Sequence, residues 1–466
     1  MSGIHVPRRS FLAGCMATFG LGGWRLFAAP PGWKPPENPR LVFGVISDTH
    51  LRTRHVGPKI GANWPDKYLV AAFEYFREQN VDAVAHCGDM AHRGQVEELQ
   101  FHANAWNRVF PKNRAPDGHE VVKLFVSGNH DAEGSSYGDF VEKRYPDPVK
   151  RAAHVLATDM AANWERIWGE KYEPAWHKEV KGYHFFGRHW GVDFAAVSAR
   201  LKGGAEKWGL AQGSRPFFYL HHQRPSADAR KQLLPYRNAV CFFGHNHWSA
   251  ANWNMAYLYY NALPVIEVPS CEPRGCTALV GDDYISKAKL EGREAVGKGR
   301  QGYVVRVYDD MMAIARREFG EGGSLGADWI MPLERKTGPH PLQRNEMKKR
   351  IGEPQFRDGA QPVVRCEAEA VKIEIPRADG NPDSRTYAYD VVIAGDSGKL
   401  HKAVYAAGCN LGMGHEPEGG KTTLAIPRGE LPQGQSLICA VRPLTSLGTF
   451  GRAVSATFSV SGLAAS

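Results

Sequence analysis

The sequence has little that would cross-link the chain or place it in a bilayer. It contains 8 cysteines in 466 residues, and no two of them form a Cys-x-x-Cys pair. This scattered set gives no disulfide framework, although the spacing of Cys271 and Cys276 leaves one disulfide open. After the amino-terminal segment, no apolar run approaches the roughly 20 residues that a membrane-spanning helix needs. We therefore expect no stable transmembrane segment.

The sequence also lacks a block of basic residues. It has 58 Lys and Arg against 49 Asp and Glu, a formal net charge of +9. A nucleic-acid-binding arm usually shows as a run of Lys and Arg, and none is present. The mild excess of positive charge fits an anionic substrate, but it also fits an ordinary soluble surface. Charge alone therefore does not identify the ligand.

The amino terminus has the features of an export signal. The pair Arg8-Arg9 is followed by an apolar, Gly/Ala-rich stretch through Leu21, and Ala28-Ala29 offers a small-residue cleavage site. Residues 1–29 resemble a twin-arginine signal peptide, which implies export by the twin-arginine machinery to the periplasm or cell envelope. Cys15 lies in a sequence similar to a lipoprotein cleavage box. Because almost no apolar residues separate it from Arg9, we do not expect lipid anchoring.

The length suits two or three domains, and the apolar pattern divides the chain accordingly. In the first part, short apolar runs alternate with apolar residues repeated at three- and four-residue steps, which predicts a parallel, layered α/β sheet. From Val363 onward, short alternating runs separated by turns predict a small β-sandwich. The end of that region resembles a fibronectin type III-like module. The predicted units are a signal peptide (1–29), an α/β domain (38–335), a linker (336–362) and a β-sandwich (363–466).

Five short polar motifs each follow directly on a predicted strand. The carboxyl ends of strands in an open α/β sheet are where ligands bind, so these motifs can converge although they are far apart in sequence. A glycine before Asp89, Asn129 and His245 permits a sharp backbone turn there. The motifs are Asp48-Thr49-His50, Gly88-Asp89, Gly128-Asn129-His130-Asp131, His221-His222 and Gly244-His245-Asn246-His247.

The residue types in these motifs indicate a metal centre. Aspartate, histidine and one asparagine amide suit Mn, Fe or Zn, and the absence of thiolates argues against a closed structural zinc site. Seven ligands exceed what one ion accommodates, whereas two ions that share a bridging carboxylate would use them all. Each motif alone is weak evidence. All five in this order predict a centre of two divalent or mixed-valence metal ions.

The ordered motifs resemble those of the calcineurin-like metallophosphoesterases over residues 41–320. The resemblance implies a two-sheet αββα sandwich with two metals at one edge, followed here by the small all-β domain. We prefer His221 to His222 as a ligand because it comes first after the strand, where the family places its ligand. The implied ligands are Asp48, His50 and His247 for one metal and Asn129, His221 and His245 for the other, with Asp89 bridging.

The resemblance also implies an activity, that of a metal-dependent phosphoric ester hydrolase acting on phosphomonoesters or phosphodiesters. A metal-bound hydroxide would attack phosphorus in line, and His130 would assist the leaving group. Asp131 would orient the His130 imidazole by a hydrogen bond. His92 stands where purple acid phosphatases carry a metal-bound tyrosine and where the DNA-repair nuclease branch carries a histidine. It is therefore a candidate phosphoryl contact, with a surface histidine at a helix start as the equal alternative.

Two alternatives to an exported phosphoesterase of small molecules stay open. The first is a nuclease of the same family. The second is a surface-binding protein whose carboxy-terminal sandwich acts beside an inactive phosphoesterase-like domain. The modest charge, the missing basic groove and the export signal favour a small-molecule phosphate ester over nucleic acid. The complete set of ligands argues against an inactive domain.

Overall fold

The structure is a computed structural model that describes residues 37–56, 59–62, 67–133, 142–210, 215–272, 290–291, 300–333, 339–381, 384–409 and 421–460. The signal peptide expected over residues 1–29 and the cysteine at position 276 lie outside the described residues. Within these ranges, no helix combines the length and the apolar composition that crossing a membrane requires.

The first large sheet contains the strands that precede three of the polar motifs. Its strand order is β15-β14-β13-β1-β4-β5, with β16 paired to β14. The three strands β1, β4 and β5 run parallel, as the alternating pattern predicts, whereas β13 and β14 add an antiparallel edge. The sheet is therefore mixed. Its strands are β1 (Leu41–Ile46), β4 (Ala83–Cys87), β5 (Val122–Val126), β13 (Gln301–Val307), β14 (Met311–Glu318), β15 (Gly323–Ser324) and β16 (Trp329–Pro332).

The second large sheet contains the strands that precede the other two motifs. Its order is β10-β11-β9-β8-β7-β6, in which β7, β8, β9 and β11 run parallel and the two edge strands run antiparallel. The strands are β6 (Ala175–Val180), β7 (Tyr183–Arg188), β8 (Phe217–His221), β9 (Ala239–Phe243), β10 (Ala256–Tyr259) and β11 (Leu263–Glu267).

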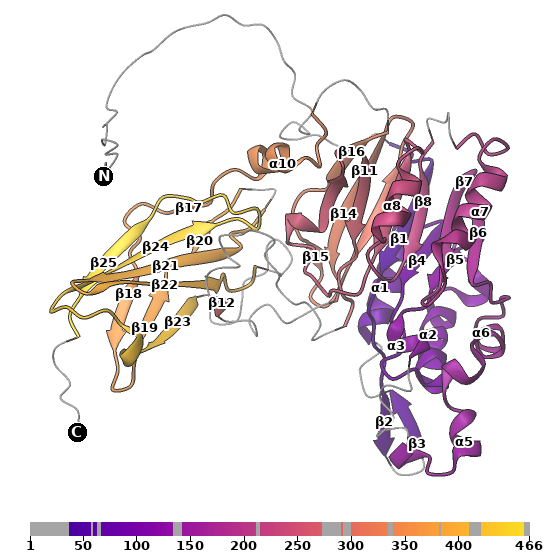
Figure 1. The fold of residues 1–466 in the computed structure, drawn as a ribbon, viewed down its shortest axis with the longest axis horizontal. Coiled ribbons are helices and arrows are strands. Elements are labelled where there is room, and N and C mark those ends of the chain that lie inside the picture. Colours follow the sequence, from indigo (N-terminus) through magenta and orange to yellow (C-terminus); the bar gives the residue numbers. More distant parts are fainter. Residues whose placement is uncertain are drawn as a thin grey trace, which may run out of the picture.

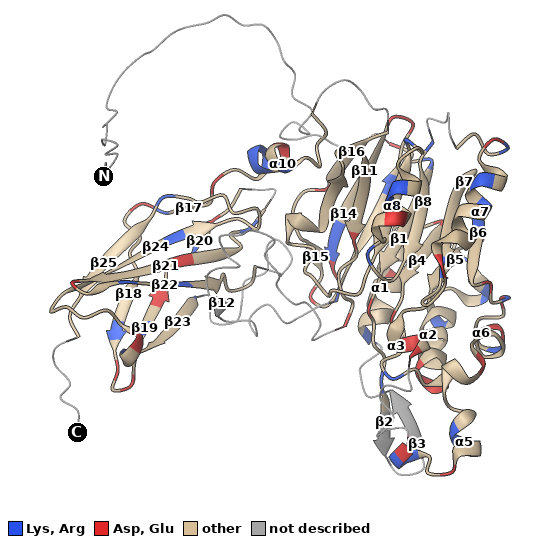
Figure 2. Ribbon diagram, viewed as in Figure 1, with Lys and Arg blue, Asp and Glu red and all other residues tan. Residues whose placement is uncertain are grey.

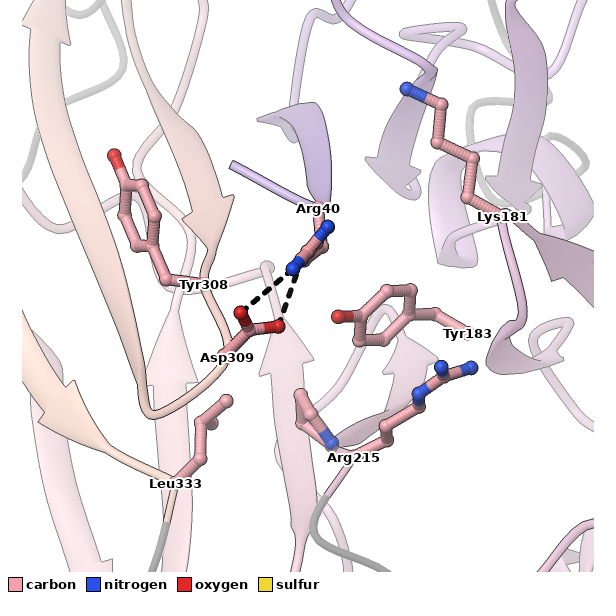
Figure 3. Close-up of a pocket in the computed structure, with 8 residues that line it drawn as sticks. Arg40, Lys181, Tyr183, Arg215, Tyr308, Asp309 and Leu333 are labelled. Atoms are coloured by element: carbon pink, nitrogen blue, oxygen red, sulfur yellow. Dashed lines mark hydrogen bonds and ion pairs between the residues drawn. The ribbon is translucent and has the colours of Figure 1, made fainter. Parts of the chain in front are cut away.

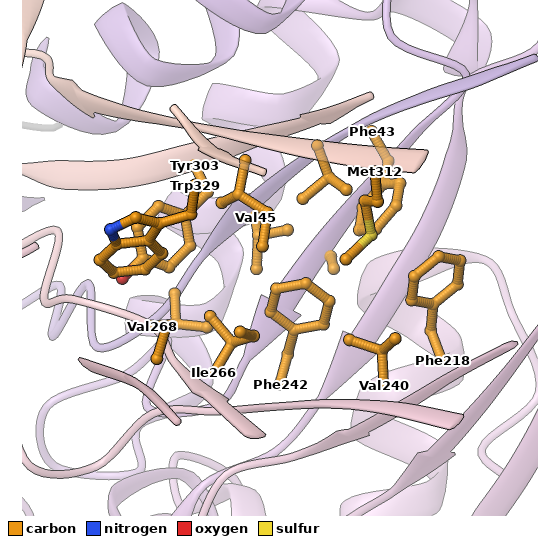
Figure 4. Close-up of a cluster of buried hydrophobic side chains, with 14 of the residues drawn as sticks. Phe43, Val45, Phe218, Val240, Phe242, Ile266, Val268, Tyr303, Met312 and Trp329 are labelled. Carbon is orange, nitrogen blue, oxygen red and sulfur yellow. The ribbon is translucent and has the colours of Figure 1, made fainter. Parts of the chain in front are cut away.

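The two sheets share one hydrophobic core, part of which is drawn in Figure 4. Phe43 of β1 meets Phe218 of β8 edge to face, with ring centroids 4.9 Å apart. Alternation along β8 divides its side chains, because Phe218 and Leu220 join this core while Phe217 and Tyr219 join a cluster on the outer face. Burial of each such side chain contributes about 1.5–3 kcal/mol. The shared core fixes the two sheets, and hence their loops, relative to one another.

Helices cover the outer faces of both sheets. Those that follow β1 and β4 pack on the first sheet through apolar faces that the three- and four-residue spacing predicts. The first sheet carries α1 (Lys67–Glu78), α2 (Val96–Val109) and α6 (Met160–Trp168), and the second carries α7 (Phe194–Gly204) and α8 (Ala227–Leu233). The shorter elements of this region are β2 (Thr53–Val56), β3 (Lys59–Ala62), η1 (Pro111–Asn113), α3 (Asn129–Ala132), α5 (Pro148–Ala152), η3 (Leu156–Asp159) and η4 (Trp253–Met255).

The carboxy-terminal region is all β and lies to one side of the α/β region (Figure 1). A five-stranded sheet, β12-β22-β21-β24-β25, and a three-stranded sheet, β18-β19-β23, share a third hydrophobic core. β12 pairs with β22 although it precedes the expected domain boundary. The elements are β12 (Leu290–Glu291), β18 (Val363–Cys366), β19 (Ala370–Ile375), β20 (Ala378–Asp379), β21 (Ala388–Gly395), β22 (Gly398–Tyr405), β23 (Thr422–Pro427), η6 (Arg428–Glu430), β24 (Leu437–Leu444) and β25 (Val454–Phe458).

The segment expected to be a linker, residues 336–362, is packed over most of its described part. It contains helix α10 (Arg344–Ile351) and strand β17 (Gln355–Phe356), which pairs with β20. Met347 and Ile351 of the helix are buried in the core between the two large sheets. The helix contains only two large apolar residues, too few to give a helical pattern in the sequence. In the view of Figure 1, α10 lies between the α/β region and the β region.

Candidate metal centre

The five polar motifs meet at one edge of the two large sheets. Asp48 N donates to the Gly88 carbonyl at 2.9 Å, and His50 N donates to the Asp89 carbonyl at 3.0 Å. The loops after β1 and β4 are thus joined by their backbones. His245 N donates to Asp48 Oδ2 at 3.0 Å, which ties the loop after β9 to the same point. Convergence at the carboxyl ends of the strands is therefore as the sequence predicts.

Five of the predicted ligands have a left-handed backbone. For a residue other than glycine this conformation costs of order 1–3 kcal/mol and persists only where the surrounding structure holds it. Such residues concentrate at functional sites, and here they hold the side chains that converge. Their φ angles are 53° for Asp48, 44° for His50, 57° for Asp89, 81° for His245 and 57° for His247.

Glycines next to the ligands allow a close approach of side chains. Gly88 has a φ of 94°, and a Cβ there would lie 2.6 Å from His222 Nδ1. At Gly128, whose φ is −103°, a Cβ would lie 2.1 Å from Asp89 Oδ1. The sharp turn that the sequence predicts before the ligands is therefore present at Gly88. At Gly128 a glycine is required instead because a side chain would collide with Asp89.

The first group of donor atoms comes from Asp48, His50 and His247. The Nε2 atoms of the two imidazoles lie 3.0 Å apart, and His247 Nε2 lies 3.1 Å from Asp48 Oδ1. Asp48 is fully buried, and beyond this contact with His247 its Oδ1 has no hydrogen-bond partner among the residues that the structure describes. Burial raises the pKa of Asp48, but His247 and the neighbouring histidines outweigh burial and hold that pKa below its usual range. A carboxylate oxygen thus stays anionic beside two imidazole nitrogens.

The second group comes from Asp89, His222 and His245, with Asn129 beside them. Asn129 Oδ1 lies 3.0 Å from His222 Nε2 and 3.1 Å from His245 Nδ1. His222 Nε2 in turn lies 3.1 Å from His245 Nδ1. An amide oxygen and two imidazole nitrogens therefore surround one point. Burial lowers the pKa of His222, but Asp89 outweighs burial and raises it to about 9.

Asp89 lies between the two groups. Its Oδ2 is 3.1 Å from His222 Nε2 in the second group and 3.6 Å from His50 Nε2 in the first. Its Oδ1 accepts a hydrogen bond from the backbone N–H of His130 at 2.9 Å, which fixes the carboxylate. This is the position that a bridging carboxylate must take.

The structure corrects the choice between the two adjacent histidines. His222, and not His221, lies with Asn129 and His245. His221 bonds instead to the Gln223 carbonyl through Nδ1 at 2.7 Å and lies beside Arg188. Alternation along β8 explains the difference, since His222 continues the inward row of Phe218 and Leu220. The alternation of inward and outward residues is present in the sequence. It identifies the inward-facing histidine better than the rule that the first histidine after the strand is the ligand.

His130 lies at the predicted place, but its imidazole is held differently from the prediction. His130 Nδ1 bonds to the backbone carbonyl of His92 at 2.7 Å, and its Nε2 lies 4.0 Å from Asp89 Oδ2. Asp131 accepts instead from three backbone N–H groups, those of Gly128, Met90 and Ala91, at 2.7–3.3 Å. Asp131 is the third residue of the short helix α3, and its carboxylate turns back to cap the start of that helix. Asp131 therefore holds two loops together and does not orient His130.

His92 lies at the centre and not on an outer surface. Its imidazole stacks on that of His130, with ring centroids 5.5 Å apart and planes 22° apart. It also forms a third group of donor atoms with His50 and His130. Its position thus agrees with a contact to substrate.

The donor atoms suit metal ions of the expected kind. Bonds of about 2.0–2.2 Å from one ion to nitrogen and oxygen ligands place those ligands roughly 3–3.5 Å from one another. The separations of 3.0–3.1 Å in both groups agree with this range. Asp48 Oδ1 is buried and faces imidazole nitrogens at 3.1–3.8 Å, an arrangement in which a cation held between these atoms would be coordinated by all of them. The residues present therefore fit two ions.

A hollow of about 550 Å³ lies away from this centre (Figure 3). Arg40 precedes β1, whereas Asp48 follows it, so the hollow opens at the opposite edge of the sheet. Two of its three cations are paired within the protein, Arg40 with Asp309 at 2.8 Å and Lys181 with Asp82 at 2.6 Å, and the third, Arg215, lies over the Tyr183 ring. It therefore has no part in the metal centre. The lining residues are Arg40, Lys181, Tyr183, Arg215, Pro216, Tyr308, Asp309 and Leu333.

Comparison with known families agrees with the geometry. Residues 41–249 match the model of the calcineurin-like phosphoesterase family. The chain therefore contains a calcineurin-like phosphoesterase domain over these residues, and that span includes every candidate ligand described above. No curated protein matches the sequence.

The solved structures that the chain matches include phosphoesterases. A dimetal phosphatase from Danio rerio is 10% identical, with a TM-score of 0.35, and the match covers 64% of this chain and 100% of that one. A purple acid phosphatase from yellow lupin (Lupinus luteus) seeds is 10% identical, with a TM-score of 0.37, over 63% of this chain and 54% of that one. An archaeal phosphodiesterase is 16% identical, with a TM-score of 0.22, over 50% of this chain and 85% of that one. At such low identities and scores, none of these activities carries over to this chain.

Proposed function

We propose that the protein is a metal-dependent hydrolase of phosphate esters that works with two ions. Asp48, His50 and His247 would hold one ion, Asn129, His222 and His245 would hold the other, and Asp89 would bridge them. The observation that carries the proposal is the position of Asp89, whose Oδ2 lies within 3.1–3.6 Å of an imidazole nitrogen from each group. A carboxylate in this place can bridge two ions that lie side by side, which supports the proposal.

The ions would supply an activated water near neutral pH and neutralise charge on the phosphoryl oxygens. The chain itself supplies His130, whose Nδ1 is fixed by the His92 carbonyl so that Nε2 faces Asp89. From that side Nε2 can give a proton to the departing alkoxide, a role typically worth 10²–10⁴-fold in rate. His92, stacked on His130, is placed to contact a phosphoryl oxygen.

A small-molecule phosphomonoester or phosphodiester is the proposed substrate. Lys and Arg are interspersed with Asp and Glu along the ribbon in Figure 2, which supports a small molecule over a nucleic-acid backbone. Cleavage of single- or double-stranded DNA in the presence of Mn would favour the nuclease alternative. Absence of bound metal would favour the surface-binding protein with an inactive domain.

The proposal extends to the rest of the chain. Two sheets flanked by helices support an αββα sandwich, and the two carboxy-terminal sheets around one core support a fibronectin type III-like module. Export to the periplasm or cell envelope rests on the Arg8-Arg9 segment. Replacing both arginines with lysine should retain the protein in the cytoplasm, and undisturbed export would refute the twin-arginine route.

The test is a substrate screen on metal-reconstituted protein. The chain is loaded with Mn, Zn or Fe and assayed with p-nitrophenyl phosphate as a monoester and bis(p-nitrophenyl) phosphate as a diester. We expect metal-dependent hydrolysis that falls by at least about 100-fold in Asp89→Asn. Asp310→Asn, a change at an exposed aspartate in the β13–β14 turn, is the control and should retain full activity. Hydrolysis that is independent of metal or of Asp89 would overturn the proposal.

A further inference from the structure

The loop that carries His245 and His247 continues into a segment fixed to the first sheet. Ser249 Oγ and Ala250 N both donate to Gln301 Oε1, at 3.2 and 2.8 Å. The Ala250 carbonyl accepts from the buried guanidinium of Arg316 at 3.0 Å. The chain just after His247 is therefore held by side chains of β13 and β14.

The next part of the same segment is held by the carboxy-terminal β region. Trp253 N donates to Ser446 Oγ at 2.9 Å, and Asn254 Nδ2 donates to the Ser446 carbonyl at 2.7 Å. Ser446 lies in the turn between β24 and β25 and is fully buried. The turn is closed by its own hydrogen bonds, from Thr445 N to the Thr449 carbonyl at 3.0 Å and from Thr449 N to Thr445 Oγ1 at 3.1 Å. A rigid turn thus reaches from one region into the other.

Leu447, next in that turn, completes the core of the α/β region. Its side chain is fully buried and belongs to the cluster that includes Phe43 and Phe242 between the two large sheets. Arg344 at the start of α10 strengthens the contact, since it donates to Asn254 Oδ1 at 2.9 Å and to the Leu447 carbonyl at 3.2 Å. The contact between the regions is therefore part of a folded core.

We infer that the turn containing Ser446 and Leu447 is a positioning element for the metal centre. This inference rests on the proposed function. His245 and His247 both have left-handed backbones, which the surrounding structure must hold in place. Trp253, which Ser446 holds and whose ring packs against Trp329 and Arg316, lies six residues after His247. The turn thus fixes the far end of a segment whose near end is held by Gln301. The β region thus keeps the imidazoles of this loop at the distances that the ions require.

The test compares truncations of the turn with a matched change in the same region. The variants are Leu447→Ala and Ser446→Ala, the conservative Leu447→Met, and Ile438→Ala as a control at a side chain that is 49% exposed. Metal affinity is measured by chelator competition on the full chain, well below the unfolding temperature of each variant. We expect about 10-fold weaker affinity for Leu447→Ala and Ser446→Ala, as for residues that support ligands from behind. Leu447→Met and Ile438→Ala should bind as the wild type does.

A double variant separates positioning from general loss of stability. In a His247→Ala background only His245 of this loop remains to be positioned, so Leu447→Ala should weaken metal binding further by clearly less than the factor of about 10 expected in the wild type. An equal further loss in that background would overturn the inference, as would lowered thermal stability with unchanged affinity. If the wild type binds two ions and hydrolyses esters while Leu447→Ala does the same, only the inference fails. If the wild type binds no metal, the proposed function fails with it.

Discussion

Asp89 and His222 lie 3.1 Å apart, from carboxylate Oδ2 to imidazole Nε2, although 133 residues separate them along the chain. They come from different sheets, Asp89 after β4 and His222 after β8. Their approach depends on Gly88, where any side chain would collide with the His222 ring. The edges of the two sheets must therefore lie close together at this point for the metal centre to form.

The first prediction compares alanine substitutions of the two adjacent histidines, His221 and His222. His222→Ala should remove a ligand and reduce both metal content and activity by at least about 100-fold. His221→Ala should leave metal content near that of the wild type, because His221 contacts Arg188 and the Gln223 carbonyl. Metal analysis of the two purified variants checks this. The reverse pattern would restore His221 as the ligand.

Substitution of His130 should affect the catalytic rate, whereas substitution of Asp131 should affect stability. His130→Gln should lower kcat by 10²–10⁴-fold, with a smaller effect on esters whose leaving group needs no proton. Asp131→Asn should instead lower stability by about 1–3 kcal/mol, because its amide nitrogen cannot accept from the backbone N–H groups. Rates with p-nitrophenyl and alkyl phosphates, together with denaturant unfolding, distinguish the two. A leaving-group dependence in Asp131→Asn would contradict the capping role.

A methyl group at Gly128 should disrupt the centre. The Cβ of Gly128→Ala would lie 2.1 Å from Asp89 Oδ1, and since φ is −103° the conflict is steric and not conformational. We expect loss of bound metal with the fold retained. Gly203→Ala is the control, because none of the described residues has an atom within 4 Å of its Cβ position in α7. Full metal content in Gly128→Ala would show that Asp89 is not fixed as described.

A buried histidine outside the centre should make the protein sensitive to acid. His102 is fully buried among Phe73, Phe125 and Trp168, and neither ring nitrogen has a hydrogen-bond partner among the described residues. Burial holds the pKa of His102 well below its usual value, so the unfolded chain gains a proton below about pH 6.5 that the folded chain does not. Stability is thus fully present above that pH and is lost as the pH falls.

His102→Phe should raise the free energy of unfolding by about 1–3 kcal/mol at pH 7, because it removes two unpaired polar atoms. The gain should grow by up to about 1.4 kcal/mol for each pH unit below 6.5. Denaturant unfolding at pH 5 and pH 7 measures both effects. A gain that does not depend on pH would mean that His102 is protonated in the folded protein.

Much of the fold followed from apolar patterning, because the strands β1, β4, β5, β8 and β9 are runs of mostly apolar residues. The convergence of most candidate ligands followed too, since each comes where such a run ends. The role predicted for Asp131 was wrong. A carboxylate next to a histidine in the sequence suggests a hydrogen bond between the two side chains, whereas capping by Asp131 can be recognised only when Gly128 is known to precede a helix. Leu447 could not be predicted at all. Its role depends on contact between regions that are about two hundred residues apart, which no local pattern records.

Anomalous X-ray scattering from crystals of the Mn- or Zn-reconstituted protein tests the central claim most directly. We predict two peaks about 3.5–4 Å apart, one on each side of the Asp89 carboxylate, with His222 and not His221 bound to one of them. A single peak, or metal that lies away from Asp89, would contradict the account.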